Sequence, residues 1–166
     1  MAVRRVLELP DPLLKQVARP VGRVDDQARA VAFDLVDTMR ATRACVGLAA
    51  PQIGVGVRAF VVDVSGHPKA RSCHGELVLF DPELLSADAP ELGREGCLSV
   101  PHFTGDVARA TRLIVRGITP AGTSTTSTVD AFEARAVLHE LDHLDGLLFL
   151  DRVASPEAVF RRKVYR

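Results

Sequence analysis

The stretch His-Glu-Leu-Asp-His at residues 139–143 constrains this chain more than any other. On an α-helix of about 3.6 residues per turn, His139 and His143 project from the same face, and Glu140 lies beside them. Two neutral imidazoles at this spacing can hold a divalent cation, and a neighbouring carboxylate can take a proton from a bound water. Taken alone, the motif also fits two ordinary polar histidines on an exposed helix face.

The residues around this motif predict the helix that the two histidines need. Asp130 followed by Glu133 three positions later is a capping-box pattern, and Gly146 is a helix stop signal. Between them, aromatic, small and histidine positions share one stripe of the expected helix: Phe132, Ala136, His139 and His143. We therefore expect a helix whose buried face carries the histidines, and buried histidines need partners.

Length and charge exclude several classes of protein. The chain has 166 residues, the size of one compact domain, and we expect residues 1–166 to form a single domain. Lys plus Arg number 21 and Asp plus Glu number 21, so the formal net charge is zero and specific binding to DNA or RNA is disfavoured. No apolar stretch has the length of a signal-peptide core or a membrane span, so we expect a cytoplasmic protein without membrane contact.

The three cysteines, Cys45, Cys73 and Cys97, are too few and too odd in number for a disulfide scaffold. Cys97 stands in a Glu-Gly-Cys-Leu-Ser segment and has three interpretations: a small buried apolar residue, a nucleophile with one of the motif histidines as its base, or a metal ligand. Cys73 lies with His67 and His74 in a predicted surface loop. We interpret these three as bystanders, because no helix or turn would aim them together.

The remaining periodicity predicts one further helix and several strands. Apolar residues recur at helical spacing from Asp25 to about Arg43, with acidic residues at the front and arginines at the back. Segments rich in β-branched residues predict strands at 57–64, 76–80, 112–118 and 123–129, and the last two are expected to pair across a turn.

Two segments are predicted to be connections without regular structure. Residues 45–54 combine small residues with Gly and Pro, which let the backbone approach a ligand closely, and the Gln52 amide can donate to a substrate oxygen. Residues 95–101 are expected to lie between strands. The opening of the chain, with its Pro10-Asp11-Pro12 signal, is expected to lie as an arm over the domain.

Three segments, in this order, resemble the motifs of the peptide deformylase family. They are Val46-Gly47-Leu48-Ala49-Ala50-Pro51-Gln52, Glu95-Gly96-Cys97-Leu98-Ser99 and His139-Glu140-Leu141-Asp142-His143. The opening Leu9-Pro10-Asp11-Pro12-Leu13 is similar to the family's N-terminal arm. The resemblance therefore covers nearly the whole chain, and the ordered trio makes it specific.

Two positions depart from the family pattern. Cys45 stands where the family usually has the first Gly of its loop, and Leu138 stands where a Gln usually precedes the first His. The first change alters the backbone lining the substrate cleft, and the second removes a hydrogen bond near the site. Both bear on substrate preference and rate more than on the type of reaction.

The resemblance implies a fold and a metal site. The fold is α+β, with antiparallel strands packed around a central helix that bears the His-Glu-Leu-Asp-His motif. Cys97, His139 and His143 are implied to bind one metal ion and to leave a fourth position for water. Glu140 is implied to be the general base and acid that moves a proton from water to the leaving amine.

The resemblance also implies how substrate is held. Val46 and Gly47 would bind a peptide as an added strand, and the substrate is nascent polypeptide carrying N-formylmethionine. The backbone N–H of Leu98 and the side-chain amide of Gln52 would stabilise the oxyanion that forms at the formyl oxygen, together with the metal. The products would be formate and a free N-terminus.

The implied metal is iron(II), with zinc or nickel as possible substitutes, and Cys and His ligands suit all three. Residues 160–166 concentrate positive charge, which fits a solvated tail or, by family resemblance, a segment that docks on the ribosome surface. Two other functions stay open. One is a metallohydrolase of the same fold that acts on another N-formyl or N-acyl compound. The other is a structural zinc-binding domain, although no fourth His or Cys has a convincing spacing.

Overall fold

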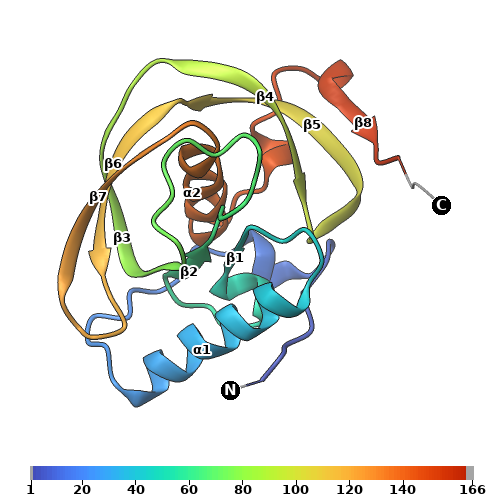
Figure 1. Cartoon of the computed structure of the whole chain (residues 1–166). Helices are drawn as coiled ribbons and strands as arrows, with labels where there is room; N and C mark the ends of the chain where they lie inside the picture. The colour runs from blue at the N-terminus through green and yellow to red at the C-terminus, as the bar shows by residue number, and fades with distance from the viewer. Residues whose placement is uncertain (1, 164–166) are drawn as a thin grey trace.

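The computed structural model describes residues 2–163, which fold into antiparallel sheets and a small number of helices (Figure 1). The helices and strands, in chain order, are α1 (Asp26–Ala41), β1 (Gly47–Ala49), β2 (Ala59–Val62), β3 (Leu77–Ala87), β4 (Pro90–Cys97), β5 (Val100–Ala110), β6 (Arg112–Ile118), β7 (Ser124–Asp130), α2 (Ala131–Leu144) and β8 (Val159–Arg161). Short 3₁₀ helices are η1 (Pro12–Lys15), η2 (Ala50–Ile53), η3 (Phe149–Asp151) and η4 (Pro156–Ala158). The predicted α+β class with antiparallel strands is confirmed.

The strands form a five-stranded sheet in the order β1-β2-β3-β6-β7 and a three-stranded sheet in the order β4-β5-β8. The second sheet is built on a long hairpin in which Pro90 pairs with Ala110 and Glu95 pairs with Gly105. Leu98 and Ser99 form the turn between its two strands. Cys97 therefore lies where a strand ends and the chain reverses.

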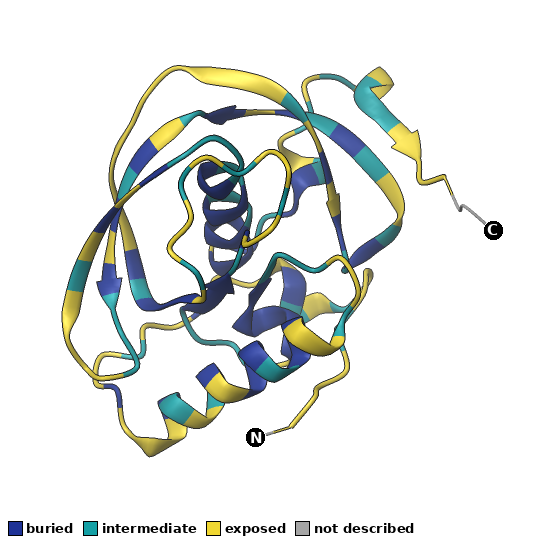
Figure 2. Cartoon of the chain, in the orientation of Figure 1, coloured by how far each residue is buried: buried dark blue, intermediate teal, exposed yellow. Residues whose placement is uncertain are grey.

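Strand β2 lies between helices α1 and α2, and both of its faces are buried. Successive side chains of a strand point to opposite faces. Phe60 and Val62 belong to the same apolar cluster as Val137 of α2, whereas Val61 packs in the cluster that contains Leu35 of α1. Helices α1 and α2 thus cover opposite faces of this sheet, and Figure 2 shows the buried residues of α2 among the strands.

Both predicted helices are present. Helix α1 begins after Asp25, whose side chain accepts a hydrogen bond from the Ala28 N–H at 2.9 Å, so the acidic residues at the front act as expected. Helix α2 ends at Leu144, and Gly146 follows with φ of 72°, the left-handed conformation that favours glycine after a helix.

The predicted capping box at the start of α2 is wrong. Asp130 occupies the N-cap position, but its side chain accepts from the Ser72 N–H at 2.9 Å and makes no capping hydrogen bond. Glu133 accepts from the Ser72 hydroxyl at 2.8 Å and from the His74 N–H at 2.7 Å. Both acidic side chains therefore hold the preceding loop against the helix, a long-range contact that local sequence cannot reveal.

Several strand boundaries also differ from expectation. The segment predicted at 57–64 is shorter, β3 continues seven residues beyond Phe80 to Ala87, and residues 47–49 form β1 within the stretch predicted to be irregular. Most of 95–101 belongs to the ends of β4 and β5, which were predicted as a connection. The paired strands at 112–118 and 124–130 are confirmed. Pairing with a neighbouring strand stabilises the β4 and β5 backbone despite Gly, Pro and charged residues.

The N-terminal segment lies over the domain as expected. The Leu7 N–H donates to the Gln52 carbonyl at 2.7 Å, and the Leu9 N–H donates to the Ser99 carbonyl at 3.0 Å. The arm therefore links η2 to the hairpin turn. Among residues 2–163, no helix combines the length and the apolar character needed to cross a membrane.

The basic C-terminal segment is only partly a tail. Thr104 of β5 pairs with Phe160 of β8, and the guanidinium of Arg94 lies 3.8 Å from the centre of the Phe160 ring. Residues 160 and 161 are thus held in a strand, and residues 164–166 lie outside the described part of the chain.

Candidate metal centre

Cys97, His139 and His143 meet at the junction of β4 and α2. Their ligating atoms all lie within 4.8 Å of one another, and the Cys97 sulfur is 3.3 Å from Nε2 of His143. The helix sets the two imidazoles one turn apart, with ring centroids separated by 5.1 Å. One thiol and two imidazoles form a donor set that suits a divalent transition metal. The structure brings together the three residues that the resemblance implied as ligands.

Two buried polar atoms, one beside this cluster and one in it, lack a hydrogen-bond partner among the described residues. Within residues 2–163, neither Oε2 of Glu140 nor Nδ1 of His143 has a hydrogen bond. Buried polar groups are nearly always paired, and an exception often marks a catalytic role or a missing ligand. The donor set therefore fits a bound metal ion, and the free oxygen of Glu140 fits a hydrogen bond to a ligand in the site.

His139 is fixed from behind by a network of charged side chains. Nδ1 of His139 lies 2.8 Å from Glu95, and Arg109 binds both oxygens of that carboxylate at 2.9 and 3.0 Å. Arg109 also donates to Asp142, and Arg135 donates to Glu95 at 2.8 Å. Burial would raise the pKa of Glu95, but the hydrogen bonds from His139 and Arg109 lower it to about 2. An ionised Glu95 thus orients the ring of His139.

The two imidazoles differ in their electrostatic surroundings. Burial would lower the pKa of His139, but the neighbouring Cys97 sulfur and Glu95 carboxylate raise that pKa above its usual range. Burial, followed by the positive charges of His139 and Arg109, lowers the pKa of His143. His143 is therefore kept in the neutral form that binds a cation.

Glu140 has the environment of a proton-transfer group. Burial raises the pKa of Glu140 to about 7, although the positive charge of His139 opposes the shift. Its carboxylate lies against the backbone of Gly47, where an added Cβ would approach Oε1 to 2.5 Å. Gly47 is thus required by the close approach of the carboxylate, and the raised pKa suits exchange of a proton near neutral pH.

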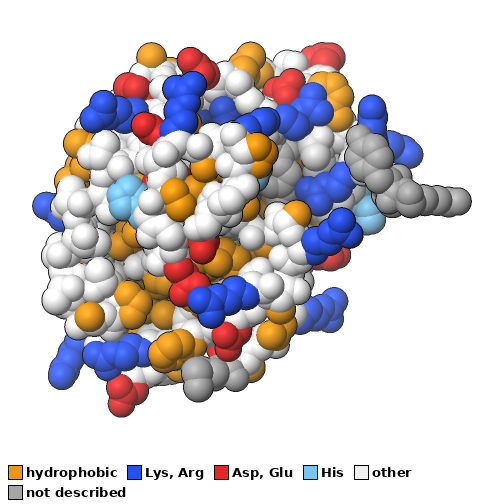
Figure 3. All heavy atoms as spheres, in the orientation of Figure 1, with side chains coloured by type: hydrophobic (Ala, Val, Ile, Leu, Met, Phe, Trp, Pro, Cys, Tyr) orange, Lys and Arg blue, Asp and Glu red, His pale blue; other side chains and the backbone are white. Residues whose placement is uncertain are grey.

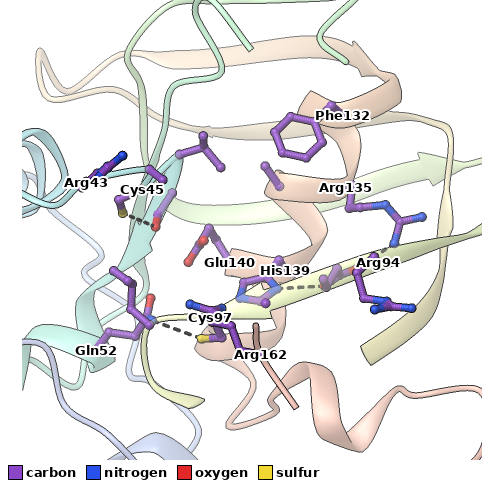
Figure 4. A pocket seen from close by; sticks show the side chains of 17 residues that line it. Arg43, Cys45, Gln52, Arg94, Cys97, Phe132, Arg135, His139, Glu140 and Arg162 are labelled. Atoms are coloured by element: carbon purple, nitrogen blue, oxygen red, sulfur yellow. Dashed lines mark hydrogen bonds and ion pairs between the residues drawn. The ribbon is translucent and has the colours of Figure 1, made fainter. Parts of the chain in front are cut away.

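A pocket of about 350 Å³ opens in front of the cluster (Figure 4). This volume is in the range of small-ligand sites. The sequence-predicted residues that line it include Val46, Gly47, Gln52, Leu98, Cys97, His139 and Glu140. His143 lies deeper and is fully buried. The Gln52 side-chain amide points toward the cluster, with Nε2 3.6 Å from the Cys97 sulfur and 3.2 Å from the Ser99 hydroxyl.

The two departures from the family pattern occupy different places. Cys45 lines the pocket, and its thiol donates to the Gly47 carbonyl at 3.2 Å. Burial, with the nearby charge of Glu140, raises the pKa of Cys45 to about 12, so this thiol is a poor nucleophile. Leu138 packs partly buried against the apolar cluster beneath α2. Cys73 is exposed beside Ser65, and His74 pairs with Glu133, so both lie outside the metal cluster.

The network behind His139 is not predicted from the sequence. Glu95 and Asp142 stand within the motifs, but their spacing assigns them no role, and Arg109 lies outside the motifs. The only signal in the sequence for Arg109 is its position two residues after Val107, because on a strand both side chains would face the same side. In the structure both are buried. That signal needed the β5 strand, which was itself missed.

The fold and site define a small α+β protein with a Cys-His-His donor set and a buried glutamate beside it. Residues 3–159 match the polypeptide deformylase family, and the chain belongs to that family. A curated peptide deformylase of Desulforudis audaxviator is 43% identical over 165 residues, covering 98% of this chain and 99% of the relative.

Solved structures agree with this assignment. The crystal structure of peptide deformylase from Thermotoga maritima is similar with a TM-score of 0.84 and 32% identity, covering 93% of this chain and 100% of that one. A peptide deformylase from Legionella pneumophila is similar with a TM-score of 0.85 and 37% identity, covering 95% of this chain and 89% of that one.

Proposed function

We propose that this protein is a hydrolase that removes the formyl group from N-formylmethionine at the start of nascent polypeptides and releases formate. The arrangement that supports this function best is the Cys97, His139 and His143 cluster with the buried carboxylate of Glu140 beside it. Family membership supports the same reaction.

Cys97, His139 and His143 would hold one divalent metal ion, natively iron(II), which zinc or nickel can replace. The bound ion would polarise the formyl oxygen and lower the pKa of a bound water. The residues present suit such an ion, because they offer one thiol and two imidazoles while Glu95 already fixes one of the rings. Among the described residues, the cluster includes no fourth ligand, which favours a catalytic over a structural metal site.

Glu140 would move the proton. Its carboxylate accepts a proton from the attacking water and then delivers a proton to the departing amine, so water adds to the formyl carbon and the C–N bond breaks. Formate and a free amino group are the products. A pKa of about 7 supports both directions of transfer, because neither protonation state is strongly favoured at neutral pH.

The oxyanion would be stabilised by the backbone N–H of Leu98 and the side-chain amide of Gln52. Leu98 lies in the turn directly after Cys97, and both residues line the pocket. The amide of Gln52 is held in place because its oxygen accepts from the Ala49 N–H at 2.9 Å. Its Nε2 lies 3.6 Å from the Cys97 sulfur and 3.2 Å from the Ser99 hydroxyl, so the N–H group directed at Cys97 would turn to the oxyanion when substrate binds.

The substrate backbone would bind along Val46 and Gly47 as an added strand. Strand β1 is at the edge of its sheet, and the Asp63 N–H binds the Val46 carbonyl at 2.9 Å on the side of β2. Backbone groups of successive residues alternate in direction, so those of Gly47 face the open side. An incoming peptide N–H would replace the Cys45 thiol at the Gly47 carbonyl.

This function also assigns an organisation and a location to the protein. Residues 1–166 would act as a single catalytic domain, with the antiparallel strands surrounding the α2 helix as its central element. Contacts of α2 with β1, β2, β5, β6 and β7 support that arrangement. The enzyme would work in the cytoplasm, where nascent chains emerge, and its basic end would approach the ribosome surface. If the protein co-sediments with ribosomes equally at low salt with and without residues 160–166, the proposed contact between this basic end and the ribosome is refuted.

The deciding experiment is a formate-release assay on protein purified anaerobically, with its metal content measured. We expect metal-dependent release from formyl-Met-Ala-Ser and little hydrolysis of the matching acetyl peptide. Equal hydrolysis of acetyl and formyl peptides would assign the site to another N-acyl substrate. A metal-replete protein that hydrolyses neither peptide would refute the proposed function.

A further inference from the structure

The mouth of the pocket is positively charged in a chain whose formal net charge is zero. Its lining contains more basic than acidic residues, with four arginines against two glutamates: Arg43, Arg94, Arg135, Arg162, Glu95 and Glu140. Both glutamates are buried, whereas three of the arginines are exposed to solvent. The local excess of positive charge therefore faces whatever enters the pocket. Figure 3 shows basic side chains gathered near the C-terminal end of the described chain.

Two of the four guanidinium groups are available to a ligand. Arg135 is held by a carboxylate and by backbone carbonyls, and Arg94 pairs with Asp106 at 2.7 Å. In the part of the chain that the structure describes, the side chains of Arg43 and Arg162 make no hydrogen bond or ion pair. An exposed arginine with no partner retains all five of its donors for a carboxylate.

Arg43 and Arg162 reach the pocket from different parts of the fold. Arg43 lies in the turn after α1, and Arg162 directly follows β8, where its N–H donates to the His102 carbonyl at 2.9 Å. The guanidinium of Arg162 lies against Gly96, one residue before Cys97. Figure 4 shows the two arginines on different sides of the pocket, with Glu140 between them.

We propose that Arg43 and Arg162 make the pocket selective for formylated peptides that carry Asp or Glu at the second or third residue. This inference rests on the proposed function, because it concerns the peptide that follows the formyl group. Successive side chains of an extended peptide point to opposite sides, so neighbouring residues would face different arginines. Guanidinium groups bind carboxylates in a bidentate geometry and repel lysine. The charge of Glu95 is already compensated by Arg109 and Arg135, so it does not offset this preference at the rim.

The test compares kcat/KM for formyl-Met-Asp-Ala and formyl-Met-Ala-Asp with formyl-Met-Ala-Ala and with the two lysine counterparts. At low salt we expect the better aspartate peptide to exceed the alanine peptide about two- to fivefold, the scale of an exposed ion pair, and the lysine peptides to fall below it. The preference should shrink at about 1 M salt, where screening extends over only about 3 Å.

Single charge reversals locate the effect. Arg43→Glu or Arg162→Glu should reverse the preference at one of the two positions. Arg161→Glu is the matched control, because Arg161 is an exposed neighbour outside the pocket lining and should keep the wild-type preference. Arg43→Gln and Arg162→Gln, which alter the fold less, should abolish the preference without reversing it.

Two outcomes would overturn the inference. One is equal kcat/KM for the aspartate, alanine and lysine peptides in the wild-type enzyme. The other is a preference that changes as much in Arg161→Glu as in Arg162→Glu. Formate release from formyl-Met-Ala-Ala separates this failure from failure of the proposed function: release without charge dependence refutes only the role of the arginines, whereas no release from any peptide refutes the function itself.

Discussion

The charged side chains behind His139 form an inner wall (Glu95 and Arg109), and those in front of it form an outer wall (Glu140 and Arg162). The two walls differ in how these side chains are paired. Behind His139, Glu95 and Arg109 are both buried, and each is bound by more than one charged partner. In front of His139, Glu140 leaves one carboxylate oxygen without a partner, and the side chain of Arg162 makes no ion pair with a described residue. Among the described residues, pairing therefore decreases across the His139 ring, from the fully paired Glu95 and Arg109 to the free oxygen of Glu140 and the unpaired Arg162.

This difference separates positioning from reaction. A charge removed from water is costly unless it is paired, so the inner network persists only because its members satisfy one another. Such a network fixes the ring that it contacts. A group that must accept a proton or bind a ligand has to remain free of strong partners. Substitutions on the two walls should consequently fail in different ways.

Replacing the thiol should have the largest effect. Cys97→Ser removes both the soft donor and its negative charge, so we expect loss of bound metal together with loss of formate release. Cys45→Ser and Cys73→Ser are the matched controls and should retain metal, because neither belongs to the cluster. The measurements are metal content and formate release for each variant.

The same series distinguishes a ligand from a nucleophile. Full metal occupancy in an inactive Cys97→Ser would favour covalent catalysis by the thiolate. An active Cys97→Ser with bound metal would refute the three-residue site.

Removing the free carboxylate should give the second largest effect. Glu140→Ala should keep the metal yet lose roughly two or more powers of ten in kcat, the usual scale of general acid-base catalysis. Metal analysis and formate release on the same sample test both parts. A variant that remains fast would assign proton transfer to another group, and a variant that loses its metal would make Glu140 part of the metal site.

A substitution in the inner wall should lower kcat less than Glu140→Ala does, and it should lower the free energy of unfolding more. Glu95→Gln leaves Arg109 buried with less compensation, so we expect a loss of about 3 kcal/mol in the free energy of unfolding. Metal affinity or kcat should fall about 10- to 100-fold, because His139 is less firmly oriented. Asp106→Asn breaks the half-exposed pair with Arg94 and is the control, with an expected change below about 1 kcal/mol. Similar changes in both variants would contradict the distinction between the walls.

Two glycines test how closely the outer wall is packed. An added Cβ at Gly47 would meet the carboxylate of Glu140 at 2.5 Å, and that buried group has little room to move. We expect Gly47→Ala to lower kcat about tenfold, because a small displacement of a catalytic group is costly. At Gly96 the Cβ would meet the end of the Arg162 side chain, which is exposed and can turn away. Gly96→Ala should therefore reduce kcat less, and the reverse order would contradict this packing.

The sequence was sufficient for the parts of the site that short motifs describe. His139, Glu140 and His143 follow from helical spacing, and Cys97 had three interpretations that the family resemblance reduced to one. The resemblance also implied that Val46 and Gly47 hold the substrate, and both line the same pocket as His139 and Glu140. These features depend on local spacing, which the sequence states directly.

Other features depend on pairing across long separations, and the sequence could not supply them. Glu95 is bound by Arg109 and Arg135, which lie 14 and 40 residues away. The β4 and β5 strands were missed because their stability comes from pairing, with charged and glycine residues that disfavour strands locally. Asp130 and Glu133 lie at the start of the helix as predicted, but their side chains bind a distant loop instead of capping the helix. A pattern of residue types cannot distinguish these two uses.

The smallest expected effect concerns an ion pair far from the pocket. It tests whether pairing alone, without burial of both partners, gives the stability expected of the inner network. Asp34 accepts hydrogen bonds from the Ala2 N–H and from Nε of Arg4, both at 2.7 Å, and joins the N-terminal arm to α1. Burial would raise the pKa of Asp34, but the hydrogen bonds from Arg4 and Ala2 outweigh it, so the net pKa is lowered.

A carboxylate with a lowered pKa stabilises the fold above its unfolded pKa of about 3.9, and that contribution is lost as the pH falls through the lower, folded value. Asp34→Asn should therefore lower the free energy of unfolding by about 1 kcal/mol at pH 6, because Arg4 is half exposed and the pair is screened by solvent. The difference from wild type should shrink below pH 4, and kcat should not change. Denaturant unfolding at several pH values provides the measurement. A loss as large as that of Glu95→Gln would mean that pairing, and not burial of both partners, sets the strength of the inner network.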